Sequence, residues 1–324
     1  MTLKCLKLSV ALLAIVSSKT YAGGYPQNIN SSITKIAFKF NLADTVQDSL
    51  HLITAEGVKP KLISHQFSFT EGPAVDKKGN VFFTDQPNDQ IWEYSTDGKL
   101  TMFMDHAGRS NGMYFDKKGN LIACADEHDQ LWSISPGKKV TVLVKDYQGH
   151  RLNGPNDVWV DPQGGMYMTD PYYRRPYWDR TKPDIEGKKV YYLAPDKTTL
   201  TVADGDFVQP NGIVGTKDGK YLYVADIAAH KTYKYTINKD GSLSNRQLFV
   251  QQGSDGMTLD DHGNVYLTGR GVTVYNSKGE KIAYIELPDR QTTNLCFGGK
   301  HKDELFITAV KGIYILKMKV KGIE

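Results

Sequence analysis

Residues 111–126 read Asn111-Gly-Met-Tyr-Phe-Asp-Lys-Lys-Gly-Asn-Leu-Ile-Ala-Cys-Ala-Asp126, and this stretch decides the fold. A polar residue followed by Gly opens it, and a short apolar alternation leads into the turn Lys-Lys-Gly-Asn. A second apolar run then ends at an Asp. Hydrophobic residues with a period of two, separated by a turn containing Gly and Asn, are typical of a β-hairpin.

The same pattern recurs along the chain, and each copy begins at a polar anchor residue: Glu71, Asn111, Asn156, Asn211, Asp255 and, in a degenerate copy, Asn294. The anchors are 40, 45, 55, 44 and 39 residues apart. A four-stranded propeller blade has about this period, whereas a helical repeat would place apolar residues every three to four positions. Two more strand-like runs follow most hairpins. The sequence therefore predicts an all-β protein, a six-bladed β-propeller over residues 62–320.

Composition is that of an ordinary globular chain of 324 residues, 40% apolar and 23% charged. It excludes a disordered, collagen-like or disulfide-dense protein. The formal net charge of +4 is too small an excess to indicate nucleic-acid binding. No nucleic-acid partner is expected.

The first 22 residues have the pattern of a secretory signal peptide. Lys4 and Lys7 precede an apolar run, Leu8–Val16, and small residues suit cleavage after Ala22. An uncleaved membrane anchor is the alternative, but the apolar run is far shorter than the roughly 20 residues that cross a bilayer. We expect a periplasmic or secreted protein with no membrane anchor after cleavage.

Residues 23–61 are assigned to an N-terminal extension, and the segment around residues 59–67 is expected to supply a strand that closes the last blade. Cys124 and Cys296 lie in apolar strand patterns. One disulfide between them is conceivable in an oxidising compartment, but buried free thiols are favoured.

The six anchors should form a ring, because the first strand of each propeller blade lines the central channel. Asn-Gly and Asp-Gly are also common turn dipeptides, and this alternative stays open for Asn111 and Asn294. It fails for Glu71, since Glu is a poor turn former. Two acids, Glu71 and Asp255, with several amide oxygens describe a site for one divalent cation. Ca²⁺ fits best, and Zn²⁺ or Mn²⁺ could substitute.

Residues that follow the hairpins should converge on the same face as the ring. Among them is the segment 172–182, rich in aromatic and basic residues, which is either a lid for an anionic or sugar-like substrate or a solvated surface loop. Asn111, His128, Tyr172 and Arg174 are the expected substrate contacts. Gly108-Arg-Ser-Asn-Gly112 matches a G-x-S-x-G elbow, but a strand follows it, so Ser110 is not expected to be a nucleophile.

Six segments together resemble the senescence marker protein, gluconolactonase and luciferin-regenerating enzyme family: Phe69-Thr-Glu-Gly-Pro73, Arg151-Leu-Asn-Gly-Pro-Asn-Asp157, Thr169-Asp-Pro171, Pro210-Asn-Gly212, Ser254-Asp-Gly-Met257 and Thr293-Asn-Leu-Cys-Phe-Gly-Gly299. The resemblance implies a six-bladed propeller with one catalytic divalent cation. It places the metal ligands at Glu71, Asn156, Asn211 and Asp255, with Asp255 also the general base. Gly154 departs from this pattern, because animal members of the family carry Arg at this position.

The resemblance thus implies a metal-dependent hydrolase that opens a sugar-type or related lactone. Two other functions stay open: a propeller that binds a ligand or partner without catalysis, and an esterase or phosphotriesterase that uses the same metal site. If the protein is an enzyme of either kind, its partner is a small-molecule lactone or ester.

Overall fold

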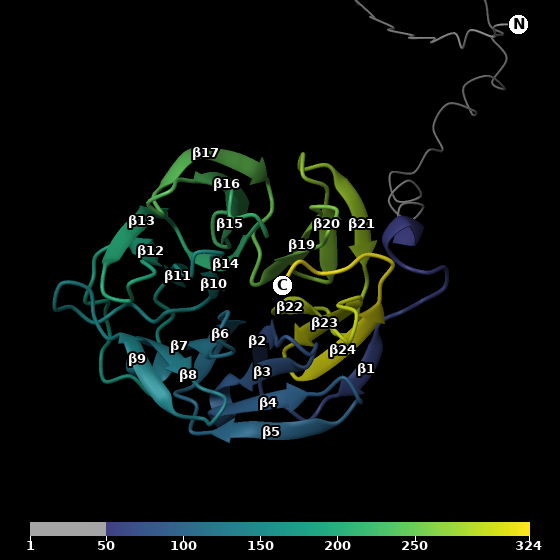
Figure 1. Cartoon of the computed structure of the whole chain (residues 1–324), viewed down its shortest axis with the longest axis horizontal. Coiled ribbons are helices and arrows are strands. Elements are labelled where there is room, and N and C mark those ends of the chain that lie inside the picture. Colours follow the sequence, from purple (N-terminus) through teal and green to yellow (C-terminus); the bar gives the residue numbers. More distant parts are fainter. Residues whose placement is uncertain (1–49) are drawn as a thin grey trace, which may run out of the picture. The chain divides into compact units, whose positions relative to one another are not determined.

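The computed structural model describes residues 50–324, which fall within one compact unit. Six four-stranded antiparallel sheets stand around a central channel, and in five of them the first strand along the chain is innermost (Figure 1). The predicted all-β fold, a six-bladed β-propeller, is confirmed.

The first three blades run outward from the channel in chain order. Blade 1 consists of β2 (Thr70–Val75), β3 (Val81–Asp85), β4 (Gln90–Tyr94) and β5 (Leu100–Asp105). Blade 2 consists of β6 (Ser110–Phe115), β7 (Leu121–Ala125), β8 (Gln130–Ile134) and β9 (Val140–Val144). Blade 3 consists of β10 (Val158–Val160), β11 (Met166–Asp170), β12 (Lys188–Leu193) and β13 (Leu200–Phe207). Two 3₁₀ turns, η1 (Gln86–Asn88) and η2 (Asp126–His128), join the second and third strands of blades 1 and 2.

Blades 4 and 5 follow the same order. Blade 4 consists of β14 (Pro210–Gly215), β15 (Tyr221–Asp226), β16 (Lys231–Ile237) and β17 (Leu243–Val250). Blade 5 consists of β18 (Met257–Leu259), β19 (Val265–Thr268), β20 (Val272–Tyr275) and β21 (Lys281–Ile285). Blade 6 contains β22 (Leu295–Gly298), β23 (Glu304–Ala309) and β24 (Gly312–Lys317), with β1 (Lys61–Ser64) as its outermost strand.

The strand β1 closes the ring of blades. It pairs antiparallel with β24, where Lys61 lies opposite Ile315 and Leu62 opposite Tyr314. The prediction that residues 59–67 supply the closing strand is confirmed. Just after β1, Phe67 packs edge-on against Phe83 at 5.1 Å and Trp92 at 5.5 Å, so the closing segment also contacts blade 1.

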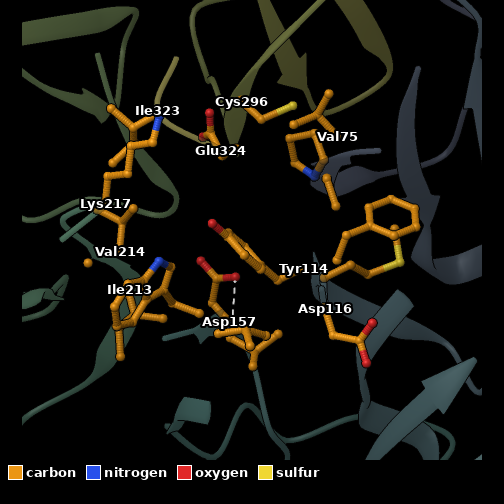
Figure 2. Close-up of a pocket in the computed structure, with 18 of the residues that line it drawn as sticks. Val75, Tyr114, Asp116, Asp157, Ile213, Val214, Lys217, Cys296, Ile323 and Glu324 are labelled. Atoms are coloured by element: carbon orange, nitrogen blue, oxygen red, sulfur yellow. Dashed lines mark hydrogen bonds between the residues drawn. The ribbon is translucent and has the colours of Figure 1, made fainter. Parts of the chain in front are cut away.

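The inner strands all run in the same direction along the channel, so their first residues lie at one end and their last residues at the other. The anchors lie at one end, where the inner strands begin. A cavity of about 410 Å³ occupies the other part of the channel. Figure 2 shows Tyr114, Asp157 and Glu324 among its lining residues, together with apolar side chains such as Ile213. Asp157 lies between the cavity and the ring of anchors.

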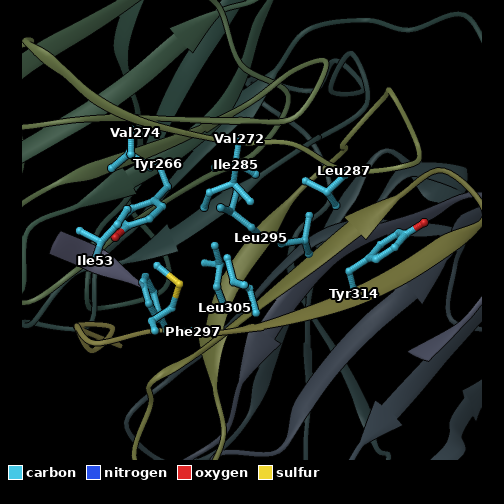
Figure 3. Close-up of a cluster of buried hydrophobic side chains, with 14 of the residues drawn as sticks. Ile53, Tyr266, Val272, Val274, Ile285, Leu287, Leu295, Phe297, Leu305 and Tyr314 are labelled. Carbon is cyan, nitrogen blue, oxygen red and sulfur yellow. The ribbon is translucent and has the colours of Figure 1, made fainter. Parts of the chain in front are cut away.

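Hydrophobic side chains fill the spaces between neighbouring blades. Between blades 5 and 6, Tyr266 and Val274 pack with Leu295 and Phe297, and Ile53 from the segment preceding β1 joins them (Figure 3). Cys124 in β7 and Cys296 in β22 are buried free thiols. These clusters support a rigid ring, which fixes the relative positions of the six anchors.

The predicted signal peptide, residues 1–22, lies outside the described residues, as does most of the assigned N-terminal extension, residues 23–61. Within residues 50–324, no helix has the length and apolar character needed to cross a membrane.

Candidate active site

The six anchors lie where the inner strands begin, as the repeat predicts. Glu71, Asn111 and Asn211 are the second residues of β2, β6 and β14, and the other three come just before β10, β18 and β22. The glycine after an anchor serves close packing between inner strands. A Cβ on Gly72 would lie 2.0 Å from the carbonyl oxygen of Asn111. Asn111-Gly and Asn211-Gly are therefore strand positions, not turns.

Glu71 is held by two hydrogen bonds on one carboxylate oxygen. Its Oε2 accepts from the backbone N–H of Gly72 at 2.6 Å and from Nδ2 of Asn294 at 3.0 Å. Oδ1 of Asn294 accepts from the N–H of Leu295 at 2.8 Å, which orients the amide. Asn294 is therefore a residue that positions Glu71, and Oε1 of Glu71 stays available to a ligand.

Three carboxyl groups in this region have raised pKa values. Burial raises the pKa of Glu71 well above its usual range, and repulsion from Asp255 and Asp157 raises it further. Burial raises the pKa of Asp255 to about 7, while the Asn211 amide and the Arg175 guanidinium act in the opposite direction. Burial likewise raises the pKa of Asp157 to about 7. Buried acids this close together repel one another unless a proton or a cation compensates the charge.

Three of the four asparagine anchors, Asn111, Asn156 and Asn211, offer amide oxygens from buried side chains. Asn156 is 6% exposed, and its side chain has no hydrogen-bond partner among the described residues. Nδ2 of Asn211 donates to the hydroxyl of Tyr173 at 2.9 Å, so the amide nitrogen faces that residue. Oδ1 of Asn111 is buried and has no partner within residues 50–324. A buried acceptor without a donor loses free energy unless a ligand satisfies it.

These observations fit a hard divalent cation. The donor set consists of carboxylate and amide oxygens, without a thiolate or an imidazole, which is the chemistry that Ca²⁺ prefers. Two repelling carboxyls are the feature that a cation would compensate. The unsatisfied amide oxygen beside them belongs to Asn111, a predicted substrate contact. Glu71, Asn156, Asn211 and Asp255 stay the predicted side chains that would hold the cation.

A second group of acids does not share this character. Asp260, Asp261 and His262 bring potential ligand atoms within 4.8 Å of one another. Asp260 already accepts hydrogen bonds from the N–H of Asn264 at 2.9 Å and the hydroxyl of Tyr266 at 2.9 Å. The same turn recurs in blade 1, where Asp76 accepts from the N–H of Asn80 at 2.8 Å. The group is a repeated turn structure.

Two of the expected substrate contacts, His128 and Arg174, are exposed. His128 stacks on Trp132 with ring centroids 5.1 Å apart. Tyr172 packs against Trp178 at 5.7 Å, and its hydroxyl is buried without a partner among the described residues. Their roles in substrate binding stay predictions.

Sequence reasoning did not single out three residues near the ring: Asp157, Tyr173 and Arg175. Asp157 occupies the position after an anchor where four other copies have Gly, and that difference was the available signal. The loop 171–187 carries Tyr173 and Arg175, but two consecutive Tyr and two consecutive Arg give no periodicity that shows which of each pair faces the ring. Ser110 lies buried in β6 and donates to the carbonyl of Ala107 at 2.6 Å, so it is not on a nucleophile elbow.

Comparisons with known proteins show what this chain is similar to. Residues 69–311 match the SMP-30/Gluconolactonase/LRE-like region. A gluconolactonase of Zymomonas mobilis is 26% identical over 81% of this chain and 82% of its own length. A zebrafish regucalcin is 28% identical over 48% of this chain and 53% of its own. The solved structure of a gluconolactonase from Xanthomonas campestris superposes with a TM-score of 0.77 at 25% identity, covering 83% of this chain and 92% of that one.

Proposed function

The chain belongs to the SMP-30/gluconolactonase/LRE-like family, and we propose that it is a lactonase, a carboxylic ester hydrolase that opens a sugar-type lactone with the help of one divalent cation. The matching family region and the gluconolactonase relatives support the reaction class. The observation that carries the proposal for this chain is the buried, mutually repelling pair of Glu71 and Asp255 beside the unsatisfied amide oxygen of Asn111, all at one end of the channel.

The residues have distinct roles in the proposed mechanism. Glu71, Asn156, Asn211 and Asp255 would hold the cation, and Ca²⁺ suits their oxygen donors best. When bound, such a cation polarises a carbonyl group and stabilises the negative charge that develops on its oxygen. Asn294 and the N–H of Gly72 keep Glu71 in place through its Oε2.

Asp255 is the proposed general base. It takes a proton from a water molecule whose oxygen adds to the lactone carbonyl carbon. The bond between that carbon and the ring oxygen then breaks, and the leaving oxygen receives the proton back from Asp255. The product is the open-chain hydroxy acid, so atoms and charges balance without another reactant.

Localisation is a separate proposal. The predicted signal peptide, residues 1–22, would direct the protein to the periplasm or the medium, where a small-molecule lactone would be its substrate. Mass spectrometry of the N-terminus of protein recovered from the periplasm tests this, and a chain that retains Met1 would contradict cleavage.

A substrate panel tests the reaction class. Aldonolactones, homoserine lactones, aryl esters and phosphotriesters are assayed with and without EDTA. We expect hydrolysis of aldonolactones that EDTA abolishes. Faster hydrolysis of aryl esters or phosphotriesters than of every lactone would show that the protein is another kind of hydrolase. No EDTA-sensitive hydrolysis in any class would favour a binding protein.

A further inference from the structure

The loop 171–187 connects β11 to β12 and reaches the ring through Tyr173. The hydroxyl of Tyr173 accepts a hydrogen bond from Nδ2 of Asn211 at 2.9 Å. The guanidinium carbon of Arg175 lies 5.5 Å from the centre of the Tyr173 ring. Arg175 is therefore separated from a proposed metal ligand by a single side chain.

Asp126, the first residue of η2 directly after β7, anchors this loop. Its Oδ2 accepts from Nε of Arg175 at 2.7 Å and also from the hydroxyl of Tyr177. Its backbone carbonyl accepts from Nε1 of Trp178 at 2.9 Å. The Asp126 side chain is 2% exposed, so these contacts are shielded from water and hold the loop in one position.

Asp126 lies one position beyond the aspartates that end the corresponding strands of blades 1 and 3, because Asp85 lies opposite Thr70, whereas Ala125 lies opposite Ser110 in blade 2. Asp85 accepts from the backbone N–H of Phe69 at 3.0 Å, and Asp170 accepts from that of Asn153 at 2.8 Å. In both blades the carboxylate supports the segment that enters its own inner strand. In blade 2 the corresponding N–H, that of Arg109, donates to Asp89 at 2.6 Å. Ala125 has no carboxylate for that role, and the carboxylate of Asp126, the next residue, binds the loop.

Gly154 provides the space that the loop occupies. Its φ of +111° lies in a region that L-residues rarely adopt. A Cβ there would lie 2.6 Å from the indole of Trp178 and 2.8 Å from Oδ1 of Asp126. Any larger residue two positions before Asn156 would displace both groups. The glycine and the loop conformation therefore depend on each other.

Arg175 keeps its two terminal nitrogens free. Only Nε has a hydrogen-bond partner within residues 50–324, and 22% of the side chain is exposed. We infer that these nitrogens bind hydroxyl groups of a polyhydroxylated lactone at the ring, and that Asp126 is the positioning residue for Arg175. This inference rests on the proposed function and names the part of the substrate that the enzyme selects.

The charges favour hydroxyl groups over an anionic group. Asp126 neutralises Arg175 through a direct ion pair, so an anion would gain little net attraction there. The planar guanidinium can still donate two parallel hydrogen bonds to neighbouring oxygens, such as vicinal hydroxyls. A lactone ring without hydroxyl groups would gain nothing from these donors.

Two lactones with the same ring size test the inference: glucono-1,5-lactone, which carries hydroxyl groups, and δ-valerolactone, which does not. For Arg175→Met we expect kcat/KM for glucono-1,5-lactone to fall roughly 10- to 100-fold, mainly through KM, because hydrogen bonds to a charged donor are lost. The value for δ-valerolactone should stay within about twofold. Equal losses for both substrates, or no loss for either, would overturn the inference.

Asp126→Asn tests positioning. Like Arg175→Met, it should raise KM for glucono-1,5-lactone. KM of the double variant should be no higher than that of Arg175→Met alone, because both changes remove one coupled interaction. Additive losses would assign Asp126 a purely structural role. Arg175→Lys should restore part of the selectivity, since it retains a donor.

Two more variants test whether the selectivity belongs to Arg175 alone. Arg246→Met removes an arginine that likewise pairs with an acid, Asp206 at 2.9 Å, and stacks on Tyr233 at 4.1 Å, but on the outer strand β17. Its kinetics should equal those of the wild type. A selectivity loss in Arg174→Met without one in Arg175→Met would move the role to Arg174 and overturn the inference.

Calorimetry with 1,5-anhydroglucitol distinguishes failure of the inference from failure of the proposed function. This molecule carries the same hydroxyl groups as glucono-1,5-lactone on a six-membered ring, has no charge and needs no turnover. Binding that weakens about tenfold or more in Arg175→Met supports the role of Arg175 even if no lactone is hydrolysed. Equal binding by both proteins, or no binding by the wild type, overturns it.

Discussion

At the scale of single residues, the site depends on how each polar side chain is paired. Asn294 fixes one oxygen of Glu71, and Tyr173 occupies the amide nitrogen of Asn211. Oδ1 of Asn111 is left without a donor among the described residues. Anchors with the same sequence pattern therefore divide into residues that position others and residues that can bind a ligand. The repeat located all of them, but only their partners in space separate the two roles.

Asp255→Asn should abolish most turnover while a cation still binds. The amide keeps one oxygen ligand but cannot take up the proton of the attacking water, so we expect kcat to fall by about 10² to 10⁴. Steady-state hydrolysis of glucono-1,5-lactone measures this. Asp97→Asn, an exposed acid in another blade's outer turn, is the matched control and should be unchanged. Wild-type kcat in Asp255→Asn would remove the general-base role.

At the scale of elements, the closing strand and the loop 171–187 show where sequence patterns are sufficient and where they are not. The strand β1 was predictable because a propeller needs a partner for the exposed edge of its last blade. The conformation of the loop was not, because it depends on Asp126 and Gly154, which are distant in the chain and meet it only in the folded ring. Its aromatic and basic composition allowed either a lid or a surface loop and did not show which arginine faces the ring.

Phe67→Ala should weaken the closure between blades 6 and 1. Phe67 is 4% exposed and contacts two aromatic rings of blade 1, so its loss leaves a cavity worth about 3 to 5 kcal/mol. Denaturant unfolding measures the free energy of unfolding. Leu62→Ala in β1, where the side chain is 47% exposed, should change it by less than about 1 kcal/mol. Similar effects of both variants would show that Phe67 does not hold the junction.

At the scale of the whole molecule, the six blades bury carboxyl groups at one end of the channel. Burying a charged carboxylate there lowers the stability of the fold. Burial raises the pKa of Glu71 and raises that of Asp255 to about 7. Without a cation, the folded protein then binds more protons than the unfolded chain. Its free energy of unfolding should fall as pH rises from about 4 towards about 7.

A cation should reverse this trend, because it binds the deprotonated carboxylates. We expect the increase in Tm on adding CaCl₂ to EDTA-treated protein to be small near about pH 5 and to grow until about pH 7 to 8. Thermal unfolding across this range measures it. An increase in Tm that does not depend on pH would mean that the cation binds away from these two acids.

Hydrolysis, in the proposed function, depends on one cation that four of the six anchors hold: Glu71, Asn156, Asn211 and Asp255. Elemental analysis of purified protein tests this claim most directly, alongside the same analysis of Glu71→Gln and of Asp261→Asn, which alters the other acidic group. We predict about one divalent cation per chain in the wild type and in Asp261→Asn, and loss of both cation and lactone hydrolysis in Glu71→Gln. A cation that stays in Glu71→Gln and disappears in Asp261→Asn would contradict this claim.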